Sequence, residues 1–224
     1  MNNTVALYDD RKTEIEFYYS IMSEVNANRQ TIHTEDDSKF LRILKSNFLL
    51  MLYNLVEACM VSGMMEIYES LRSNKSNYTD LISEIRTIWS NYEIGKVYSN
   101  DAGRSSYEKR VQDIIIQVIT NQPIALKRET LGISGNLDAK LIKDLCDKHR
   151  IRYVASDDDG CLRTVRDKRN NLAHGDESFG DCARDMTLAD LEHIKNEVFK
   201  FIKDILDGMI EYHDNKLYLT SNLS

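Results

Sequence analysis

Residues that break helices are scarce in this chain. Pro123 is the only proline among 224 residues, and there are nine glycines. Sheet-rich folds need many tight turns, and those turns depend heavily on these two residue types. Residues that favour helix, such as leucine, glutamate and lysine, are plentiful instead, and hydrophobic residues make up 42% of the chain. The composition predicts an all-α protein with a sizeable core, which we interpret as one domain over residues 1–224.

Signals for zinc binding, export and membrane insertion are also missing. The four cysteines are Cys59, Cys146, Cys161 and Cys182. They form no Cys-x-x-Cys pair, so we expect reduced thiols in a cytoplasmic protein that needs no metal or other cofactor. The first ten residues, MNNTVALYDD, contain no basic or apolar stretch of the kind an export signal has. The strongest apolar run, residues 48–61, is interrupted by Asn54 and Glu57 and is too short to cross a bilayer.

Positive charge is in the minority overall. The formal net charge is −7, which argues against a protein that holds nucleic acid by bulk electrostatics. The charge is uneven, however, because residues 148–169 contain seven lysines and arginines against four aspartates. We therefore expect any contact with nucleic acid to be local, through Arg163, Arg166 and Lys168 beside Arg169.

Hydrophobic periodicity divides the chain into helices. The predicted helices cover residues 7–26, 36–74, 77–92, 105–120, 137–149, 162–172 and 188–212. The second is apolar nearly all round, which is typical of the central helix of a bundle. Thr79 is the expected N-cap of the third, and Thr187 with Asp190 forms a capping box that starts the last. Residues 215–224 are expected to be a loose tail.

Residues 131–160 differ in character from the rest of the chain. They contain two entry glycines, the short helix 137–149, a possible strand at 151–155 and the acidic turn 157–159. Three aspartates before a glycine are more typical of a solvated turn than of a metal site. We interpret the segment as a small insertion on the bundle, whose role could be RNA contact, partner binding, covering a site or structure alone.

The sequence RNNLAHG, Arg169 to Gly175, permits two interpretations. As structure, Gly175 suits the position after a helix end, while Arg169 and His174 complement the helix dipole. As chemistry, RNA cleavage without a metal needs a base for the ribose 2′-OH and a cation for the phosphate, roles that histidine and arginine fill. Five residues of ideal helix separate the two side chains by about 140°. They converge only if His174 lies at a frayed end or a second chain contributes.

Polar residues in the central helix require an explanation. Asn47, Asn54 and Glu57 fall close to one helical face, and a buried carboxylate is costly unless it is paired. We hypothesise that Glu57 pairs with Arg169 or orients His174. The alternative is that Glu57 turns toward solvent or a backbone donor.

Arg169 to His174 resembles the R-x4-6-H motif of the HEPN superfamily, the higher-eukaryote and prokaryote nucleotide-binding domains. LLMLYNLVEACMVSGMMEIYESL and GISGNLDAKLIKDLCDKHRI are similar to the core helix and the insertion of its MAE-type bacterial branch. The resemblance implies an all-α HEPN-like bundle with long central and C-terminal helices, acting as a homodimer. It also implies metal-independent RNA cleavage that leaves a 2′,3′-cyclic phosphate.

Carried onto this chain, the resemblance makes His174 the general acid or base, while Arg169 binds the scissile phosphate and Asn170 helps to position it. It implies a role in bacterial antiviral defence or as a toxin, with RNA as substrate and a cognate antitoxin or defence protein as a possible partner. The alternative is a non-catalytic HEPN scaffold or partner-binding module. A DNA-directed nuclease is a third possibility, which the lack of a carboxylate cluster for two-metal catalysis disfavours.

Overall fold

The computed structural model describes residues 1–29, 35–98, 104–133, 135–154 and 160–222, and its secondary structure is helical. The α-helices are α1 (Asn2–Arg29), α2 (Glu35–Ser73), α3 (Ser83–Tyr98), α4 (Arg104–Ile119), α5 (Ala139–His149), α6 (Gly160–His174) and α7 (Leu188–Asp214). No strand is present in these ranges, so the predicted all-α class is confirmed.

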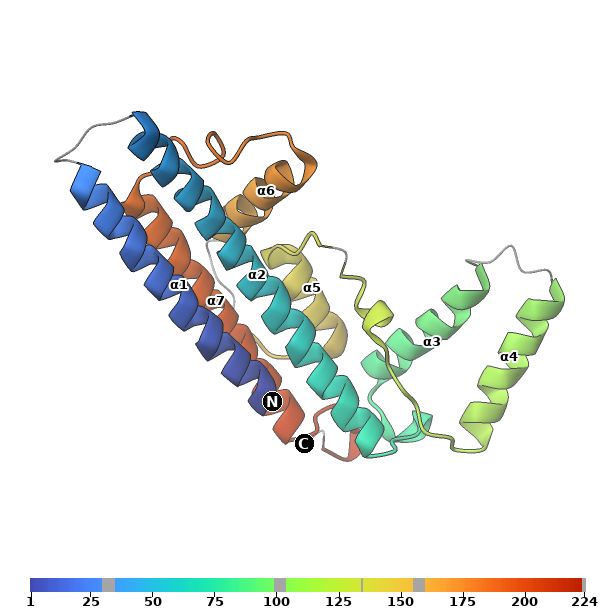
Figure 1. The fold of residues 1–224 in the computed structure, drawn as a ribbon. Coiled ribbons are helices and arrows are strands. Elements are labelled where there is room, and N and C mark those ends of the chain that lie inside the picture. Colours follow the sequence, from blue (N-terminus) through green and yellow to red (C-terminus); the bar gives the residue numbers. More distant parts are fainter. Residues whose placement is uncertain (30–34, 99–103, 134, 155–159, 223–224) are drawn as a thin grey trace.

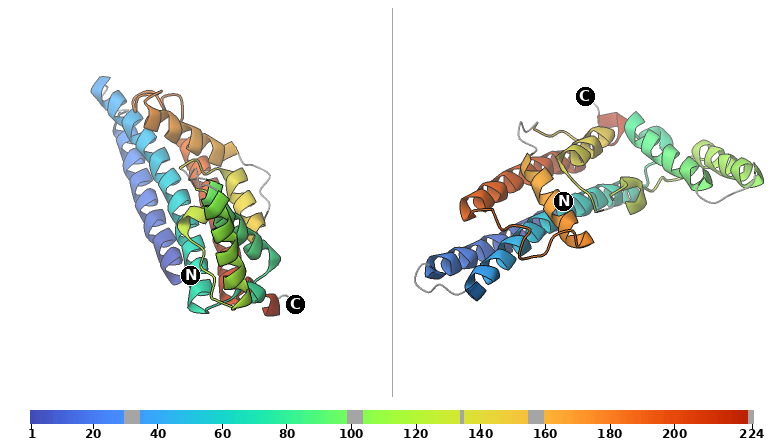
Figure 2. Two further views of the ribbon diagram at one scale, coloured as in Figure 1. Left: turned by 90° about the vertical axis from the view of Figure 1, so that its right-hand side faces the viewer. Right: turned by 90° about the horizontal axis from the view of Figure 1, so that it is seen from above.

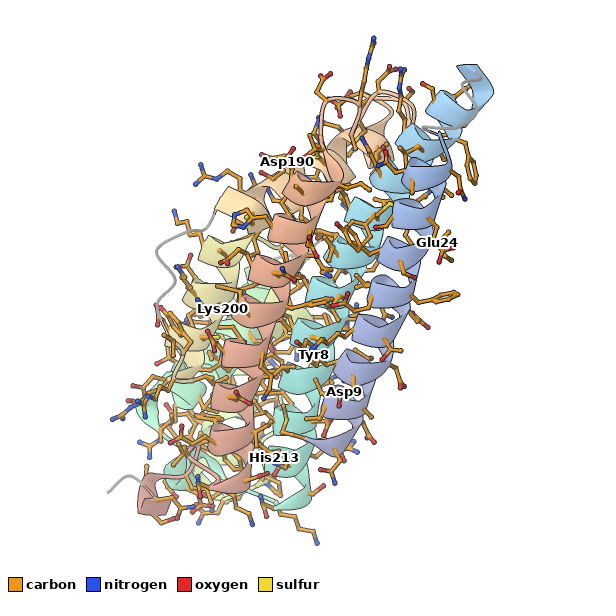
Figure 3. All side chains as sticks on the ribbon, turned by 90° about the vertical axis from the view of Figure 1, so that its left-hand side faces the viewer. Tyr8, Asp9, Glu24, Asp190, Lys200 and His213 are labelled. Atoms are coloured by element: carbon orange, nitrogen blue, oxygen red, sulfur yellow. The ribbon has the colours of Figure 1, made fainter. Side chains whose placement is uncertain are left out.

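Three long helices form the body of the molecule. Figure 1 shows α1, α2 and α7 running side by side, and the two views of Figure 2 agree. The shorter α6 crosses this body and packs against α2 and α7. The pair α3–α4 projects from one end of α2 (Figure 1). Figure 3 looks onto α7 and α1, and the exposed residues Asp9, Glu24 and Lys200 lie on these two helices.

Helix α2 supplies the centre of the core. Phe48, Leu52, Cys59 and Met64 are fully buried, as the nearly uniform apolar sequence predicts. By length and composition alone, residues Ser38–Ser73 could also cross a membrane, but 56% of their most apolar window is buried inside the bundle. The neighbouring helices therefore cover most of this apolar surface.

Helix α7 begins where the sequence predicts. The N–H of Asp190 donates to the Thr187 hydroxyl, and the Asp190 carboxylate accepts from the Thr187 N–H at 2.8 Å, which completes the capping box. Lys195 of α7 pairs with Glu16 of α1 at 2.7 Å and lies over the Tyr19 ring. Because this ammonium is almost fully buried, the contact fixes α7 against α1 more firmly than an exposed ion pair would.

The strand expected at 151–155 is wrong for its described part, residues 151–154. The Ile151 N–H closes the end of α5 by donating to the Cys146 carbonyl at 2.9 Å, and the Ile151 side chain is buried. The Arg152 carbonyl then rests against Gly208 of α7. This segment packs against a helix and not beside another strand, so it cannot form the hydrogen bonds of a β-sheet. The acidic turn 157–159 lies outside the described residues.

Several described residues of the segment predicted to be an insertion pack into the core. Leu131, Leu137, Ile142 and Leu145 are all buried in the same cluster as the long helices. In the structure it is the α3–α4 pair, not this segment, that stands away from the body (Figure 1).

The start of the third helix and the C-terminal tail differ from expectation for one shared reason. Leu81 forms an isolated antiparallel bridge with Leu219, and the Ile82 N–H donates to the Tyr218 carbonyl at 3.0 Å. Thr79 is consequently not the cap of α3: it lies in a 3-10 turn, Tyr78–Asp80, that is capped by Asn77. Residues 215–222 are anchored, not loose, because Tyr218 is fully buried.

A buried histidine joins α5 to α2. The Nδ1 of His149 lies 2.7 Å from the Leu145 carbonyl, which can only accept, so Nδ1 carries the proton. The unprotonated Nε2 lies 2.7 Å from the Tyr68 hydroxyl, which donates to it. Burial lowers the pKa of His149 to about 4, because this site accommodates only the neutral ring.

We predict that His149 makes stability depend on pH between about 6.5 and 4. The unfolded chain binds the proton first as pH falls, so the free energy of unfolding should decline over this window by a total of about 3 kcal/mol. Urea unfolding at a series of pH values measures the decline. His149→Gln should be less stable at pH 7 but should show a shallower decline; parallel curves for both proteins would contradict the assignment.

Gly208 allows the segment that contains Arg152 to pack closely against α7. A Cβ at this position would lie 1.8 Å from the Arg152 carbonyl oxygen, so Gly208→Ala should lower the free energy of unfolding by about 2 kcal/mol. Gly95 of α3 is the matched control, because a Cβ there meets nothing within 4 Å. Gly95→Ala should stabilise the protein by up to about 1 kcal/mol. Denaturant unfolding measures both, and equal effects would contradict the packing.

Candidate functional site

The motif Arg169 to Gly175 forms the end of α6. The helix stays regular to His174, and Gly175 has a φ of +78°. The Gly175 N–H donates to the Leu172 carbonyl at 3.4 Å, and the Asp176 N–H donates to the Asn171 carbonyl at 2.8 Å. This pair of bonds is a Schellman closure. The helix end is therefore not frayed, and Arg169 and His174 point to different sides of α6.

Arg169 is held in a niche made by three parts of the chain. Its guanidinium lies over the ring of Tyr53 in α2, 4.7 Å from the ring centre. Its Nη1 donates to the Gly135 carbonyl at 2.8 Å and to Asn170 Oδ1 at 3.0 Å. The Asn170 amide in turn donates to Asn136 Oδ1 at 2.9 Å. Asn170 thus ties the arginine to the loop that precedes α5.

Gly135 has two reasons to be glycine. Its φ is +78°, a left-handed conformation that other residues adopt at a cost. A Cβ would also lie 3.2 Å from the Arg169 guanidinium. A side chain at this position would therefore require the loop or the guanidinium to shift by a few tenths of an ångström.

Arg169 also lines an open pocket of about 490 Å³. The polar side chains around it are Arg11 of α1, Asn54, Glu57 and Ser62 of α2, Arg128 of the 3-10 turn Arg128–Leu131, and Arg169. Arg11 is fixed by a hydrogen bond of 3.0 Å from its Nη1 to the Asn54 carbonyl. Three cations and one carboxylate thus surround one opening in an acidic protein.

Tyr53 connects the predicted residues Glu57 and Arg169. Burial raises the pKa of Tyr53, and the negative charge of Glu57 raises it further. The Leu137 N–H, which donates to the Tyr53 hydroxyl at 3.1 Å, and the Arg169 cation oppose this rise. Glu57 and Arg169 share the pocket, yet no ion pair between them is present in the described part of the chain. Glu57 is only half-buried, so water contributes to solvating its charge.

His174 lies outside the pocket. It is the last residue of α6 and its side chain is exposed. The structure therefore brings together Arg169, Asn170 and Glu57 but leaves His174 facing solvent within one chain.

The basic residues predicted to contact RNA have different surroundings. Arg166 forms ion pairs with Asp138 and, at 2.7 Å, with Asp167, and Lys168 pairs with Glu177 at 3.1 Å. Arg163 is exposed. An incoming phosphate would have to compete with carboxylates for Arg166 and Lys168, whereas Arg163 is directly accessible.

The cysteines are poorly suited to chemistry. In the described part of the chain none of the four forms a disulfide, and all four are buried. Burial raises the pKa of Cys59 and that of Cys146 to about 12, so both thiols stay protonated and unreactive near neutrality. In the ranges that the structure describes, no three histidine, cysteine, aspartate or glutamate side chains gather into a possible metal site.

Sequence reasoning missed Tyr53, Arg11, Arg128 and the Gly135 loop. Tyr53 resembles any other apolar residue of the central helix, and neither arginine stands in a motif. The two glycines of GISGN did signal a turn, but a turn alone does not indicate which side chain it will meet.

An all-helical bundle with an R-x4-H motif at the end of the helix before the last long one is the arrangement that the resemblance to HEPN domains predicts. The comparison with family profiles agrees, because the family described as HEPN_MAE_28990-like HEPN matches residues 7–218. The chain belongs to this family. No curated protein and no solved structure matches it.

We predict that Gly135→Ala destabilises the protein through Arg169. The substitution should cost about 1–2 kcal/mol for the left-handed backbone, plus the cost of displacing the guanidinium. Gly132, with a φ of +63° and nothing within 4 Å of a Cβ, provides the control, since Gly132→Ala should incur only the backbone cost. In urea unfolding, Arg169→Ala should remove the difference between the two variants; a difference that persists would contradict the contact.

Proposed function

We propose that the protein is a metal-independent endoribonuclease whose site combines Arg169 and His174. The observation that carries this proposal is the placement of Arg169. Its guanidinium is oriented by the Gly135 carbonyl, the Asn170 side chain and the Tyr53 ring, and it borders an open pocket. Among the described residues it has no carboxylate ion pair. An oriented arginine with remaining donors is suited to a phosphate. Many HEPN domains are RNases, which agrees with this chemistry.

The reaction uses the ribose itself as nucleophile. His174 removes the proton from the 2′-OH, and the 2′-oxygen attacks the adjacent phosphorus as the bond to the 5′-oxygen breaks. The leaving 5′-oxygen takes up a proton, which yields a 2′,3′-cyclic phosphate and a 5′-OH. Arg169 stabilises the negative charge that grows on the non-bridging oxygens, while Asn170 holds the guanidinium in place.

A homodimer would complete this site. Arg169 and His174 of one α6 point to different sides of a regular helix, and His174 is exposed. Two copies related by a two-fold axis place the same surfaces opposite one another. The Arg169 of one chain can then work with the His174 of its partner.

We propose that Glu57 influences Arg169 through Tyr53, and not through a direct ion pair with Arg169. Its charge acts on Tyr53, whose ring supports Arg169. Glu57→Gln should therefore lower cleavage while leaving the fold intact. Circular dichroism and a cleavage assay measure the two effects, and unchanged cleavage would remove Glu57 from the site.

Cleavage of a structured RNA in EDTA tests the proposal. Wild-type protein should cleave and leave 2′,3′-cyclic phosphate ends, because no step needs a metal. His174→Ala and Arg169→Lys should each reduce the rate by at least about 100-fold. His193→Ala, at an exposed histidine of α7, is the control and should cleave normally. Cleavage that needs a metal, or that survives His174→Ala, would contradict the mechanism.

The alternative function is a partner-binding module of a bacterial defence complex. The exposed side chains of Ile115, Ile116 and Ile119 on the projecting α4 favour this view, with 49%, 54% and 72% of their surfaces accessible. Loss of partner binding without any RNA cleavage would support it. In either case we propose a cytoplasmic role in defence or as a toxin, with an antitoxin or defence protein as a possible partner.

A further inference from the structure

We propose that Arg11 and Arg128 form a phosphate-binding subsite that holds single-stranded RNA beside the scissile phosphate. The inference deepens the proposed ribonuclease function and rests on it. Arg11, Arg128 and Arg169 come from α1, from the turn before residue 132 and from α6, so the fold alone brings them to one pocket.

The three arginines of this pocket have no carboxylate ion pair in the part of the chain that the structure describes. By contrast, Arg72 pairs with Glu69 and Arg166 pairs with Asp167. The three cations outnumber Glu57, the one carboxylate in the lining, and like charges around one opening repel each other until an anion balances them. The pocket is therefore electrostatically suited to an anionic ligand.

The geometry favours successive phosphates over one isolated anion. Arg169 is already oriented by the loop at Gly135, and Arg11 by the Asn54 carbonyl, so their free donors are fixed in separate places. A volume of about 490 Å³ lies within the range of roughly 300–1,000 Å³ that small-molecule sites occupy, and thus suits a nucleotide. Asn54 and Ser62 add hydrogen-bonding groups to the lining.

The small size of the pocket and the negative net charge of the chain disfavour the binding of a double-stranded nucleic acid. Double-stranded nucleic acid is bound by extended basic surfaces that neutralise many phosphates, and this chain has a net charge of −7. A small pocket with three arginines can neutralise only a few charges. A single strand that presents one or two nucleotides is the ligand that matches this local charge.

Binding of a short, fluorescently labelled 2′-O-methyl oligoribonucleotide tests the inference. This probe has no free 2′-OH, so the full-length protein can bind it without cleaving it. Fluorescence anisotropy over a range of salt concentrations gives the Kd and the number of phosphates contacted. Arg128→Ala, at an exposed residue, should raise Kd about tenfold and lower the salt slope by about 1.

Arg11 is tested with a variant that preserves its charge. Arg11→Lys should keep the salt slope but raise Kd, because lysine lacks the planar fork of donors. Arg152→Ala is the matched control, since Arg152 is exposed among Asp204, Asp207 and Glu211 in a different pocket. It should bind the probe like the wild type.

The possible outcomes separate this inference from the proposed function. Binding that depends on Arg11 and Arg128, in a protein that cleaves no RNA, would support the subsite and contradict the nuclease. If the protein cleaves RNA but its binding of the probe does not depend on Arg11 or Arg128, the result would support the nuclease and contradict the subsite. A wild-type protein that does not bind the probe, or a salt slope that corresponds to about ten phosphates, would overturn the subsite.

Discussion

The contact between the Arg169 guanidinium and the Tyr53 ring is the interaction on which the site depends. It joins α6 to the central helix at a point where the ring is almost fully buried. Because Tyr53 also accepts a hydrogen bond from the Leu137 N–H, the same side chain fixes the loop whose Gly135 carbonyl holds the arginine. Removing any one of these partners would free a cation that the bundle otherwise keeps in one orientation.

Helix α2 serves both as core and as wall of the pocket. The sequence predicts a helix covered on every side, and most of its apolar residues are indeed buried. Its polar residues Asn54 and Glu57, which the helical period places close together, lie on the part of α2 that lines the pocket. The polar interruptions in an apolar helix thus coincide with a pocket, although the residues that share this pocket could not be deduced from the sequence.

Local signals predicted the elements well, and they predicted contacts between distant segments poorly. The contacts of the Thr187 capping box and of Gly175 span only a few residues, so the sequence could predict the start of α7 and the end of α6. Tyr218 and Arg152 act at long range: Tyr218 anchors the tail, and the Arg152 carbonyl packs on Gly208. No local pattern encodes those contacts. For the same reason the Arg169–His174 motif was visible, whereas Arg11 and Arg128 were not.

The central claim is that Arg169 and His174 cooperate across two chains. Mixing two inactive variants, Arg169→Ala and His174→Ala, tests it directly, since a mixed dimer contains one site with both residues intact. Random exchange makes about half of the dimers mixed, so about a quarter of wild-type cleavage should return. If subunit exchange is verified and cleavage still does not return, the two residues do not work as a pair from opposite chains.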